Sequence, residues 1–450
     1  MDPQKRFTKE QFTSIRVSAK STASMGALTA RRISDFSDSQ KDMGMKRRVL
    51  IIVENASVPE DTRVWSEAAS LQANGYEVAV LCPKDEQYTR GFEIINDIQI
   101  FRHPRTKQRE GIIGYLFEYM CALFWEFIYA WWIYLKVGFD VIQGCNPPDN
   151  IVLVAMPFKL MGIPYIFDHH DVVPELYVAK YMTMDFAYRC QCWLERLTFF
   201  VSNVVISTNG SYRDIAITRG KVNPADVFVV RNGPNSERVK IVPADASLKH
   251  GKRYLVGYVG WMDVQDSVDI ILDVAQRIKA VGRRDVHFTC VGGGPQLATL
   301  RQQVRERDLA DMVNFTGVVS DRELMEILSS SDVCVNPDKP CPMNNISTMI
   351  KIMEYMALGK AIVQFDVKEG RVSAGEASLY ANGTDYIVDF ADKILWLLDR
   401  PEERERMGEY GRLRVENELS WKHSIPSLLA AYDRAFSKKE KRAESPTREY

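Results

Sequence analysis

The chain has 450 residues, of which 46% are hydrophobic and 26% are charged, and its formal net charge is −1. These values are typical of a globular protein with roughly two domains. The balanced charge argues against a protein drawn to nucleic acid by its overall field. The eight cysteines are scattered, and the one close pair, Cys190 and Cys192, is spaced for neither a zinc knuckle nor a redox motif. We therefore expect reduced thiols and a cytoplasmic protein.

Both ends of the chain are polar and lack periodic apolar residues. Residues 1–45 are rich in Ser, Thr, Lys and Arg and contain no apolar stretch of the kind found in a signal peptide. Residues 438–450 are dominated by charged side chains. We interpret both segments as flexible tails.

The first folded region is predicted over residues 46–240. The apolar run 49–53 predicts a strand buried on both faces, 64–73 has helical spacing, and 78–81 predicts a second strand. This is a βαβ unit, which implies a parallel sheet. Later segments up to about residue 230 repeat the pattern of a strand followed by a polar loop. We expect a doubly wound domain.

A second series of alternating strands and helices begins at residue 254 and predicts another doubly wound domain over 241–437. The polar, aperiodic segment 236–253 is the expected boundary. The helices predicted over 401–437 are placed to reach back to the first domain. The fold class is therefore α/β, with two Rossmann-like domains facing a central cleft. Ligands of such sheets bind beyond the carboxyl ends of the strands.

The stretch NNISTMIKIMEYMALGK, residues 344–360, predicts a helix that begins near Ser347. Free N–H groups at such a helix start, at Ser347, Thr348 and Met349, attract an anion, and Lys351 lies one turn further on. The carboxylate of Glu354 is placed to accept hydrogen bonds from two ribose hydroxyls. The alternative is an N-cap followed by a surface ion pair between Lys351 and Glu354, worth only about 0.2–0.5 kcal/mol.

Two glycine turns follow predicted strands of the second domain. They are YVGWM, which contains Gly260, and CVGGGP, which contains Gly293. Glycine lets the backbone approach a ligand closely. The second turn does not match G-x-G-x-x-G, so an ordinary strand-to-helix turn is an equally good interpretation.

The segment FDHHDVVPE places His169, His170 and Asp171 at the end of a predicted strand. Histidine is the natural proton carrier near neutral pH. Metal binding is the rival hypothesis, but the segment lacks a pair of histidines at i and i+4. A loop of capping residues is the simpler alternative. Asp61 and Arg63 lie at the first strand–helix junction, where Arg63 is placed to grip a phosphate or carboxylate, or to be an ordinary surface residue.

Residues 111–138 form the most apolar stretch, rich in Trp, Tyr and Phe. Its length suits a bilayer span, but Glu118 and Glu126 argue against one. A buried helix and an interfacial helix remain open. We favour peripheral contact with a membrane surface, aided by the basic segment 103–109.

Taken together, these motifs resemble a known family. PEDTRVWSEAASLQANGYEVAVLCP, FDHHDVVPELY, YVGWM, VGGGP, VNFTGVVSDRELMEILSSSDVCVNP and STMIKIMEYMALGKAIV occur in the order found in GT-B glycosyltransferases of the retaining family 4 type, across residues 47–437. The resemblance implies that the first domain binds the acceptor and the second the sugar nucleotide, with Glu354 holding the donor ribose. It implies that His170 lines the reacting centre, and it places Asp61, Arg63, His169 and Asp171 on the acceptor side. It also implies that the backbone at 347–349 holds the diphosphate, without a metal or other cofactor.

Two departures from the family pattern bear on the donor. The family's first glutamate falls at Ile346 here, next to Asn345, whose amide is a neutral substitute. The basic pair that often follows the glycine of YVG is replaced by a run that begins Trp261 and Met262. Lys351 or Lys339 would then supply the positive charge.

We expect a retaining glycosyltransferase that moves a sugar from a nucleoside diphosphate, UDP rather than GDP, to a hydroxyl of a lipid-linked or other glycan acceptor. The expected location is the cytoplasmic face of the membrane, and no nucleic-acid partner is expected. The alternatives are a GT-B nucleotide-sugar epimerase and a non-catalytic partner of a transferase.

Overall fold

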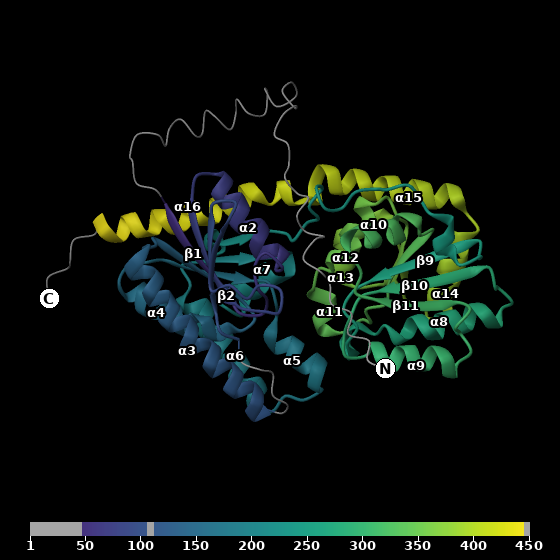
Figure 1. Cartoon of the computed structure of the whole chain (residues 1–450), viewed down its shortest axis with the longest axis horizontal. Helices are drawn as coiled ribbons and strands as arrows, with labels where there is room; N and C mark the ends of the chain where they lie inside the picture. The colour runs from purple at the N-terminus through teal and green to yellow at the C-terminus, as the bar shows by residue number, and fades with distance from the viewer. Residues whose placement is uncertain (1–46, 106–111, 445–450) are drawn as a thin grey trace, which may run out of the picture. The chain divides into compact units, whose positions relative to one another are not determined.

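The computed structural model describes residues 47–105 and 112–444. The expected N-terminal tail 1–45 lies outside this range. Figure 1 shows two α/β lobes, each built on one sheet.

The first sheet, which we call sheet A, has the strand order β3-β4-β2-β1-β5-β6-β7-β8. Only the pairing of β3 with β4 is antiparallel. The strands are β1 Arg48–Val53, β2 Glu77–Pro83, β3 Phe92–Ile95, β4 Ile98–His103, β5 Val141–Cys145, β6 Tyr165–His169, β7 Val204–Ser207 and β8 Val227–Val229. The predicted parallel sheet is confirmed, because the buried apolar runs form its central strands. The β3–β4 hairpin was not predicted.

The second sheet, sheet B, is entirely parallel, with the order β11-β10-β9-β12-β13-β14. Its strands are β9 Tyr254–Val259, β10 Val286–Val291, β11 Val313–Gly317, β12 Val333–Asn336, β13 Ile362–Phe365 and β14 Ser378–Ala381. Its helices are α8 Asp269–Ala280, α9 Leu297–Glu306, α10 Asp321–Ser330, α11 Pro342–Ile346, α12 Ile350–Ala357, α13 Lys368–Ala374, α14 Tyr386–Leu398 and α15 Pro401–Arg414.

Sheet A is covered by helices on both faces. One face packs on α2 (Thr62–Ala73) and on the C-terminal helix α16 (Ile425–Glu444). The other face packs on α3 (Ile112–Lys136), α4 (Val152–Leu160) and α6 (Phe186–Val201). The remaining helices of this lobe are α5 (Val173–Tyr181) and α7 (Gly210–Thr218). The alternation of side chains along each strand assigns Ile51 to the first face and Ile52 to the second.

Helix α16 corrects the predicted C-terminal tail. The helix continues to Glu444, so residues 438–444 are helical rather than flexible. Electrostatic anchoring explains the difference, because Lys438 pairs with Asp226 and Lys439 with Asp140 of the first lobe. Figure 1 shows α16 running along the lobe of sheet A, which brings the end of the chain back to its first domain.

The aromatic segment forms the 25-residue helix α3. Within the described residues, no helix combines the length and hydropathy needed to cross a bilayer.

Candidate active site

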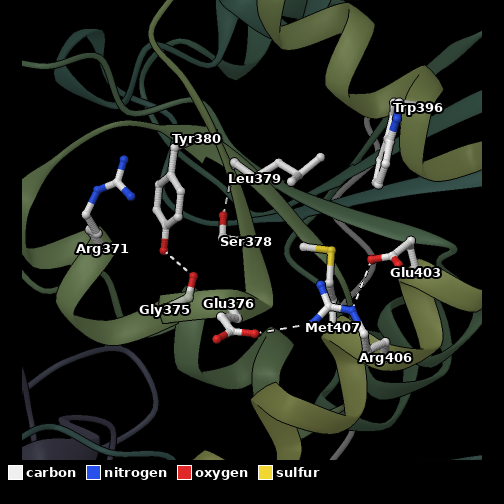
Figure 2. Close-up of a pocket in the computed structure, with 10 residues that line it drawn as sticks. All are labelled: Arg371, Gly375, Glu376, Ser378, Leu379, Tyr380, Trp396, Glu403, Arg406 and Met407. Carbon is white, nitrogen blue, oxygen red and sulfur yellow. Dashed lines mark hydrogen bonds and ion pairs between the residues drawn. The ribbon is translucent and has the colours of Figure 1, made fainter.

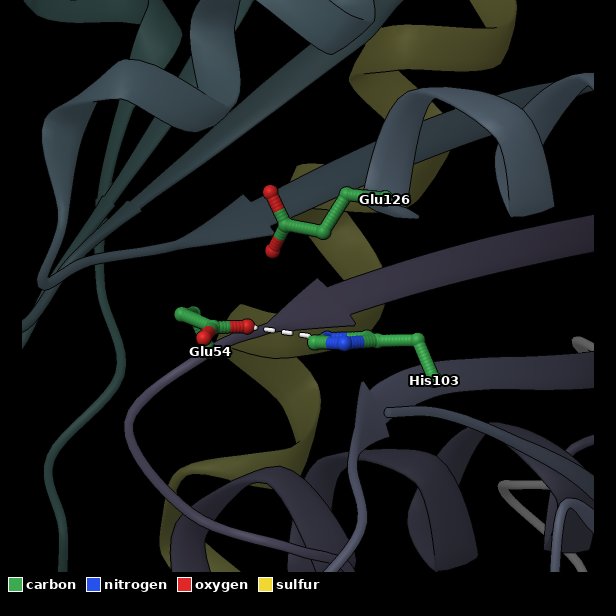
Figure 3. Close-up of side chains that lie close together, drawn as sticks. All are labelled: Glu54, His103 and Glu126. Carbon is green, nitrogen blue, oxygen red and sulfur yellow. Dashed lines mark ion pairs between the residues drawn. The ribbon is translucent and has the colours of Figure 1, made fainter. Parts of the chain in front are cut away.

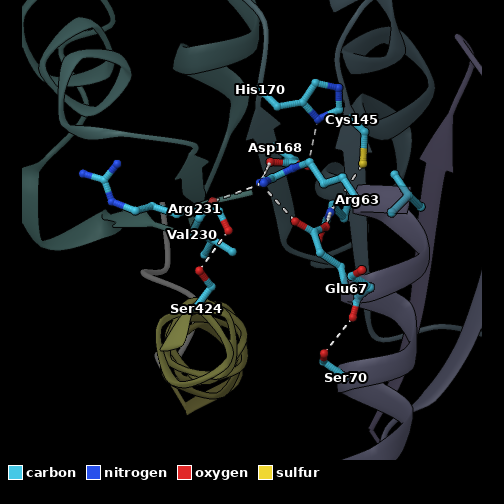
Figure 4. Close-up of polar contacts among 12 residues, drawn as sticks. Arg63, Glu67, Ser70, Cys145, Asp168, His170, Val230, Arg231 and Ser424 are labelled. Atoms are coloured by element: carbon cyan, nitrogen blue, oxygen red, sulfur yellow. Dashed lines mark hydrogen bonds and ion pairs between the residues drawn. The ribbon is translucent and has the colours of Figure 1, made fainter. Parts of the chain in front are cut away.

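A buried polar network lies where β6 ends, on the α2 face of sheet A (Figure 4). Asp168 accepts two hydrogen bonds from Arg63, at 2.7 and 3.1 Å. Its Oδ2 also lies 3.2 Å from Nδ1 of His170. Arg63 pairs in addition with Glu67 at 3.0 Å. One carboxylate therefore orients both an arginine and the histidine that was predicted to line the reacting centre.

The charges and burial of this network shift the pKa values of its side chains strongly. Burial opposes ionisation of Asp168, but Arg63 and His170 outweigh it and hold the pKa of Asp168 below its usual value. Burial likewise lowers the pKa of His170, but the hydrogen bond and charge of Asp168 prevail and raise it. Burial and the charge of Asp168 raise the pKa of Glu67 to about 7. His170 is thus stabilised in its charged form.

The two adjacent histidines have different roles. The His169 side chain is fully buried and packs between Phe167, Phe199 and Tyr212. Burial, with the charges of Arg219 and His170, lowers its pKa to about 3. We expected His169 to face the acceptor, but its ring belongs to the core because successive residues of a strand face opposite sides of the sheet.

Asn146 holds the loop after β6. Its Oδ1 accepts from the backbone N–H of His170 at 2.9 Å and of Asp171 at 3.1 Å, and its Nδ2 donates to the carbonyl of Asp171 at 2.7 Å. Asp171 therefore lies beside His170, in a loop fixed by the neighbouring strand. Burial raises the pKa of Asp171.

Asp61 and Arg63 do not act as surface ligands in this structure. Asp61 caps α2 by accepting from the backbone N–H of Val64. Arg63 is 4% exposed, and its donors are taken by Asp168, Glu67 and the carbonyl of Val230. A guanidinium with those partners serves the network rather than a phosphate.

The helix predicted to begin at Ser347 begins at Ile350 instead. A separate short helix, α11, starts at Pro342 and ends at Ile346, and Ser347 follows in an extended conformation. The N–H of Ser347 is taken by the carbonyl of Met343, so it is not available to a diphosphate. Within the described residues, the N–H groups of Thr348 and Met349 have no hydrogen-bond partner.

The connector between α11 and α12 touches the lobe of sheet A. Asn209, which caps α7, donates to the carbonyl of Ile346 and to Thr348 Oγ1, at 2.9 and 3.0 Å. Tyr212 OH lies 3.0 Å from Ser347 Oγ. These contacts explain the late helix start, because Ser and Thr side chains that bond elsewhere compete with helix formation.

Lys351 and Glu354 do not pair with each other, so the surface ion pair is excluded. Lys351 Nζ lies 3.4 Å from Asp338 Oδ2 and 4.9 Å from the centre of the Tyr258 ring. Glu354 is 8% exposed, and its Oε1 accepts from Arg238 at 2.7 Å. Burial raises the pKa of Glu354 despite Arg238. The two charges therefore face separate partners on one helix.

The glycine turns pack against each other. A Cβ on Gly292, whose φ is +135°, would lie 1.9 Å from the carbonyl oxygen of Gly260. A Cβ on Gly294 would lie 2.4 Å from the carbonyl of Met262. Gly293 was the expected ligand contact, but it is its two neighbours that must be glycine, for backbone packing. At Gly260 a Cβ would come 3.2 Å from Lys351 Nζ, so this turn lies beside the lysine that was predicted to supply positive charge.

Asn345 is exposed, and its Oδ1 accepts from the backbone N–H of Lys368 at 2.8 Å.

A cavity of about 390 Å³ lies at the edge of sheet B, around Tyr380 and Trp396 (Figure 2). None of its lining residues was predicted for the site, and Arg406 there is paired with Glu403 and Glu376.

Two protein-family models match the two lobes. The model described as "Glycosyl transferase 4-like domain" matches residues 61–233, and the one described as "Glycosyl transferases group 1" matches residues 253–400. The chain belongs to the GT-B glycosyltransferases of the family 4 type. It is therefore an enzyme, and the alternative of a non-catalytic partner is set aside.

Relatives and solved structures agree with this assignment. The alpha-maltose-1-phosphate synthase of Mycolicibacterium smegmatis is 26% identical over 297 residues, which cover 61% of this chain and 73% of the relative. Sucrose-phosphate synthase from Thermosynechococcus elongatus has the same fold, with a TM-score of 0.71, 19% identity and coverage of 87% of this chain and 100% of that one. Anabaena HepE, solved with UDP and glucose, gives a TM-score of 0.65 at 14% identity, covering 86% and 99% of the two chains.

Several residues of the candidate site were missed from the sequence. Arg238 and Asp338, the partners of Glu354 and Lys351, lie in loops without a motif. Asp168 was visible, since it directly precedes the two histidines. Successive residues of a strand face opposite sides of the sheet. The sequence could therefore have predicted that His169 faces away from Asp168 and its network.

Proposed function

We propose that the protein transfers a sugar from a nucleoside diphosphate, UDP being favoured, to a hydroxyl of a lipid-linked glycan, with retention of configuration. The observation that carries this proposal is the pair of charges on α12, Lys351 and Glu354, which face separate partners in the lobe of sheet B. The fold shared with a protein solved with UDP and glucose supports the choice of UDP.

Glu354 is suited to hold the ribose. Arg238 engages Oε1 and so orients the carboxylate, which leaves Oε2 for a sugar hydroxyl. The diphosphate would lie at the N–H groups of Thr348 and Met349, just before α12, rather than at Ser347.

Lys351 supplies the positive charge for the leaving diphosphate. Its ammonium lies beside Gly260, where the absent side chain leaves room for a phosphate oxygen. A fixed ammonium and backbone N–H groups offset developing negative charge without reorganising. We therefore propose that no metal acts at the diphosphate.

His170 lies on the acceptor side of the reaction. With Nδ1 turned toward Asp168, its Nε2 is the ring atom left to meet substrate. Ile346 stands where the family carries a glutamate, so no carboxylate nucleophile is provided there. Retention then follows from attack on the face that the diphosphate leaves, with a phosphate oxygen accepting the proton of the acceptor hydroxyl.

Three neighbouring helices present apolar side chains to the outside and support a membrane-bound acceptor. The helices α3 and α6 both contact α4, forming one layer over sheet A. The exposed apolar side chains are Tyr119, Met120, Phe124, Phe127, Ile128, Trp132 and Leu135 on α3, Leu153, Met156 and Leu160 on α4, and Phe186, Trp193 and Phe200 on α6. We call this set the apolar layer.

The arginines beside the apolar layer on α6 suit contact with anionic lipid. Phe186, Trp193 and Phe200 recur every seventh residue and are 61–82% exposed, so they share one face of α6. Arg189 and Arg196 are exposed on the same helix at the same interval. Aromatic rings and arginines are a favourable combination at a headgroup region. This supports peripheral contact with the cytoplasmic face of a membrane.

A groove beside α3 supports a lipid-linked acceptor. It has a volume of about 390 Å³ and is lined by Gly91, Phe92, Phe101, Ile128, Tyr129 and Trp132. These side chains are almost entirely apolar, which suits a hydrocarbon chain better than a sugar.

The donor assignment is tested by thermal shift with UDP, GDP and a panel of UDP-sugars. We expect UDP-sugars to raise Tm, and Glu354→Gln to weaken donor binding at least about 10-fold, the cost of roughly one charge-assisted hydrogen bond. Glu326→Gln, on the exposed side of α10, is the matched control. Equal donor affinity in Glu354→Gln would overturn the site. Release of UDP only when acceptor is added separates the transferase from an epimerase.

The membrane assignment is tested by co-sedimentation with vesicles containing phosphatidylglycerol. Replacing Phe186, Trp193 and Phe200 together by Ser should reduce binding at least about 10-fold, because three exposed aromatics leave the interface. Val318→Ser, an exposed apolar residue of the other lobe, should bind like the unmodified protein. Unchanged binding in the folded triple variant would remove α6 from the membrane contact.

A further inference from the structure

A second group of ionisable side chains lies at the carboxyl edge of sheet A, on the α3 face (Figure 3). Glu54 directly follows β1, His103 ends β4, and Glu126 projects from the middle of α3. One ligand atom from each residue lies within 4.8 Å of the other two. His103 and Glu126 are each 1% exposed, whereas the side chain of Glu54 is 11% exposed. The three meet in a nearly buried space with one edge toward solvent.

The hydrogen bonding of His103 fixes which ring nitrogen faces the acids. Nδ1 lies 3.1 Å from the carbonyl oxygen of Pro104, and a carbonyl only accepts, so Nδ1 carries a proton. Nε2 then points at Oε2 of Glu54 from 2.9 Å. Among the residues that the structure describes, neither atom has an aligned hydrogen-bond partner. A lone pair and a carboxylate at this distance repel unless a positive charge lies between them.

Glu126 adds a second unbalanced carboxylate. Its Oε1 is buried and has no partner within the described part of the chain, and Figure 3 shows its carboxyl group directed toward Glu54 and His103. The nearest arginine along the chain, Arg102, is engaged by Glu93, Ser57 and the carbonyl of Val58. Among the residues that the structure describes, no arginine or lysine forms an ion pair with Glu54 or Glu126.

We propose that Glu54, His103 and Glu126 form a binding site for one divalent cation of the zinc class. An imidazole nitrogen with two carboxylate oxygens is a donor set for Zn²⁺ and similar first-row ions, and the nitrogen disfavours Mg²⁺ and Ca²⁺. A divalent ion cancels the charge of two carboxylates, which suits a buried site. The bond from Nδ1 to the carbonyl of Pro104 is the second contact that metal-bound histidines characteristically make.

The geometry requires only a small closure. Tetrahedral zinc with bonds of roughly 2.0–2.1 Å places its ligand atoms roughly 3.3 Å apart. The pair from Glu54 and His103, at 2.9 Å, must open by roughly 0.4 Å, and the third side chain must move inward by no more than roughly 1.5 Å from the limit of 4.8 Å. Glutamate has the torsional freedom for such a movement.

A cation here would join three segments distant in sequence: the end of β1, the end of β4 and the centre of α3. Its effect is thus expected on the attachment of α3 to sheet A. The site is separate from the residues proposed to hold the donor, which belong to the lobe of sheet B, and the inference does not rest on the proposed function.

The test uses the full chain, stripped with a chelator and then titrated with Zn²⁺. Binding is measured by calorimetry and by metal content after desalting, and amide hydrogen exchange of α3 is followed with and without Zn²⁺. The variants are Glu126→Gln and His103→Gln. Glu118→Gln on the same helix and His250→Gln, an exposed histidine of the other lobe, are the matched controls.

We expect one Zn²⁺ per chain and slower exchange in α3 when Zn²⁺ is present. Glu126→Gln and His103→Gln should each weaken binding by at least about 10–100-fold, since even residues behind the ligands cost that much. Both controls should bind as the unmodified chain does. No bound Zn²⁺, or binding that persists in both ligand variants, would overturn the site and leave a proton as the charge that balances Glu126. If a variant misfolds, exchange in the unmodified chain decides: unchanged α3 protection overturns the proposal.

Discussion

Sheet A carries two buried acidic clusters at its carboxyl edge, one on each face, and they are balanced in different ways. On the α2 face, Asp168 and Glu67 surround Arg63, a cation built into the chain. On the α3 face, Glu54 and Glu126 meet only His103, and Oε1 of Glu126 is left without a partner among the described residues. The first cluster carries its own counter-charge, whereas the second needs one from outside, either a proton or a metal ion.

The difference shows that the two faces of sheet A hold buried charge in different ways. A guanidinium is always charged and holds a fixed geometry, so the α2 face is suited to orient His170 at all physiological pH values. The cluster of Glu54, His103 and Glu126 on the α3 face contains no guanidinium, so the charge that balances it must come from solution. Variants in the two clusters should therefore respond differently to pH and to metal.

The largest effect is expected from Arg63→Met. This change leaves Asp168 and Glu67 buried without their cation, and removing one partner of a buried ion pair costs about 3–5 kcal/mol. The measurement is urea unfolding at pH 7.5. Arg322→Met, whose side chain is 87% exposed and pairs with Glu326, is the control and should leave the unfolding free energy unchanged. A loss below about 1 kcal/mol for Arg63→Met would mean that the first cluster is no better balanced than the second.

The pH dependence of stability gives the next largest effect. Glu67 titrates at about 7 in the folded protein, against a usual pKa of 4.5, mainly because of burial. Between these values the folded state keeps a proton that the unfolded chain releases, so stability falls as pH rises from 4.5 to 7 and levels off above. The full effect of this group is at most about 3 kcal/mol.

Glu67→Gln tests that contribution. The variant should show a shallower fall of unfolding free energy with pH, by about 1 kcal/mol per pH unit within the window. Asp149 and Glu195, whose pKa values burial also raises to about 7, remain in the variant and keep part of the slope. Glu326→Gln, on the surface, is the control. Parallel pH curves for Glu67→Gln and the unmodified protein would contradict a raised pKa at this residue.

The sequence predicted the sheets better than the clusters. Apolar runs such as 49–53 and 254–259 gave the strands, because a parallel strand buried on both faces reads as continuous hydrophobicity. The ligands of the proposed cation site lie at 54, 103 and 126, and no spacing rule connects three segments that only the fold brings together. Local pattern therefore predicts elements, whereas buried charge balance depends on contacts between them.

The start of α12 was mispredicted for a similar reason. Ser347 and Thr348 look like helix caps by sequence, but Tyr212 and Asn209 of the other lobe engage their hydroxyls. The roles proposed for Lys351 and Glu354 were predicted from the expected helix start and from the family resemblance. Their actual partners, Asp338 and Arg238, come from distant loops.

The finest distinction between the two clusters is the titration of His170. The raised pKa of His170 depends on Asp168, so its charge adds stability fully below the usual pKa of 6.5 and loses it as pH rises through the folded value. Asp168→Asn should lower the pKa of His170, because an opposite charge at hydrogen-bond distance is removed. The imidazole signals in NMR spectra measure this directly, and His250, exposed in the other lobe, is the internal control. The same substitution leaves Glu67 as the remaining carboxylate partner of Arg63, so Glu67 should ionise more readily and the fall of stability between pH 4.5 and 7 should become shallower. A His170 titration that does not move would mean that burial and not Asp168 sets its state, and the α2 face would then lack the fixed control that separates it from the α3 face.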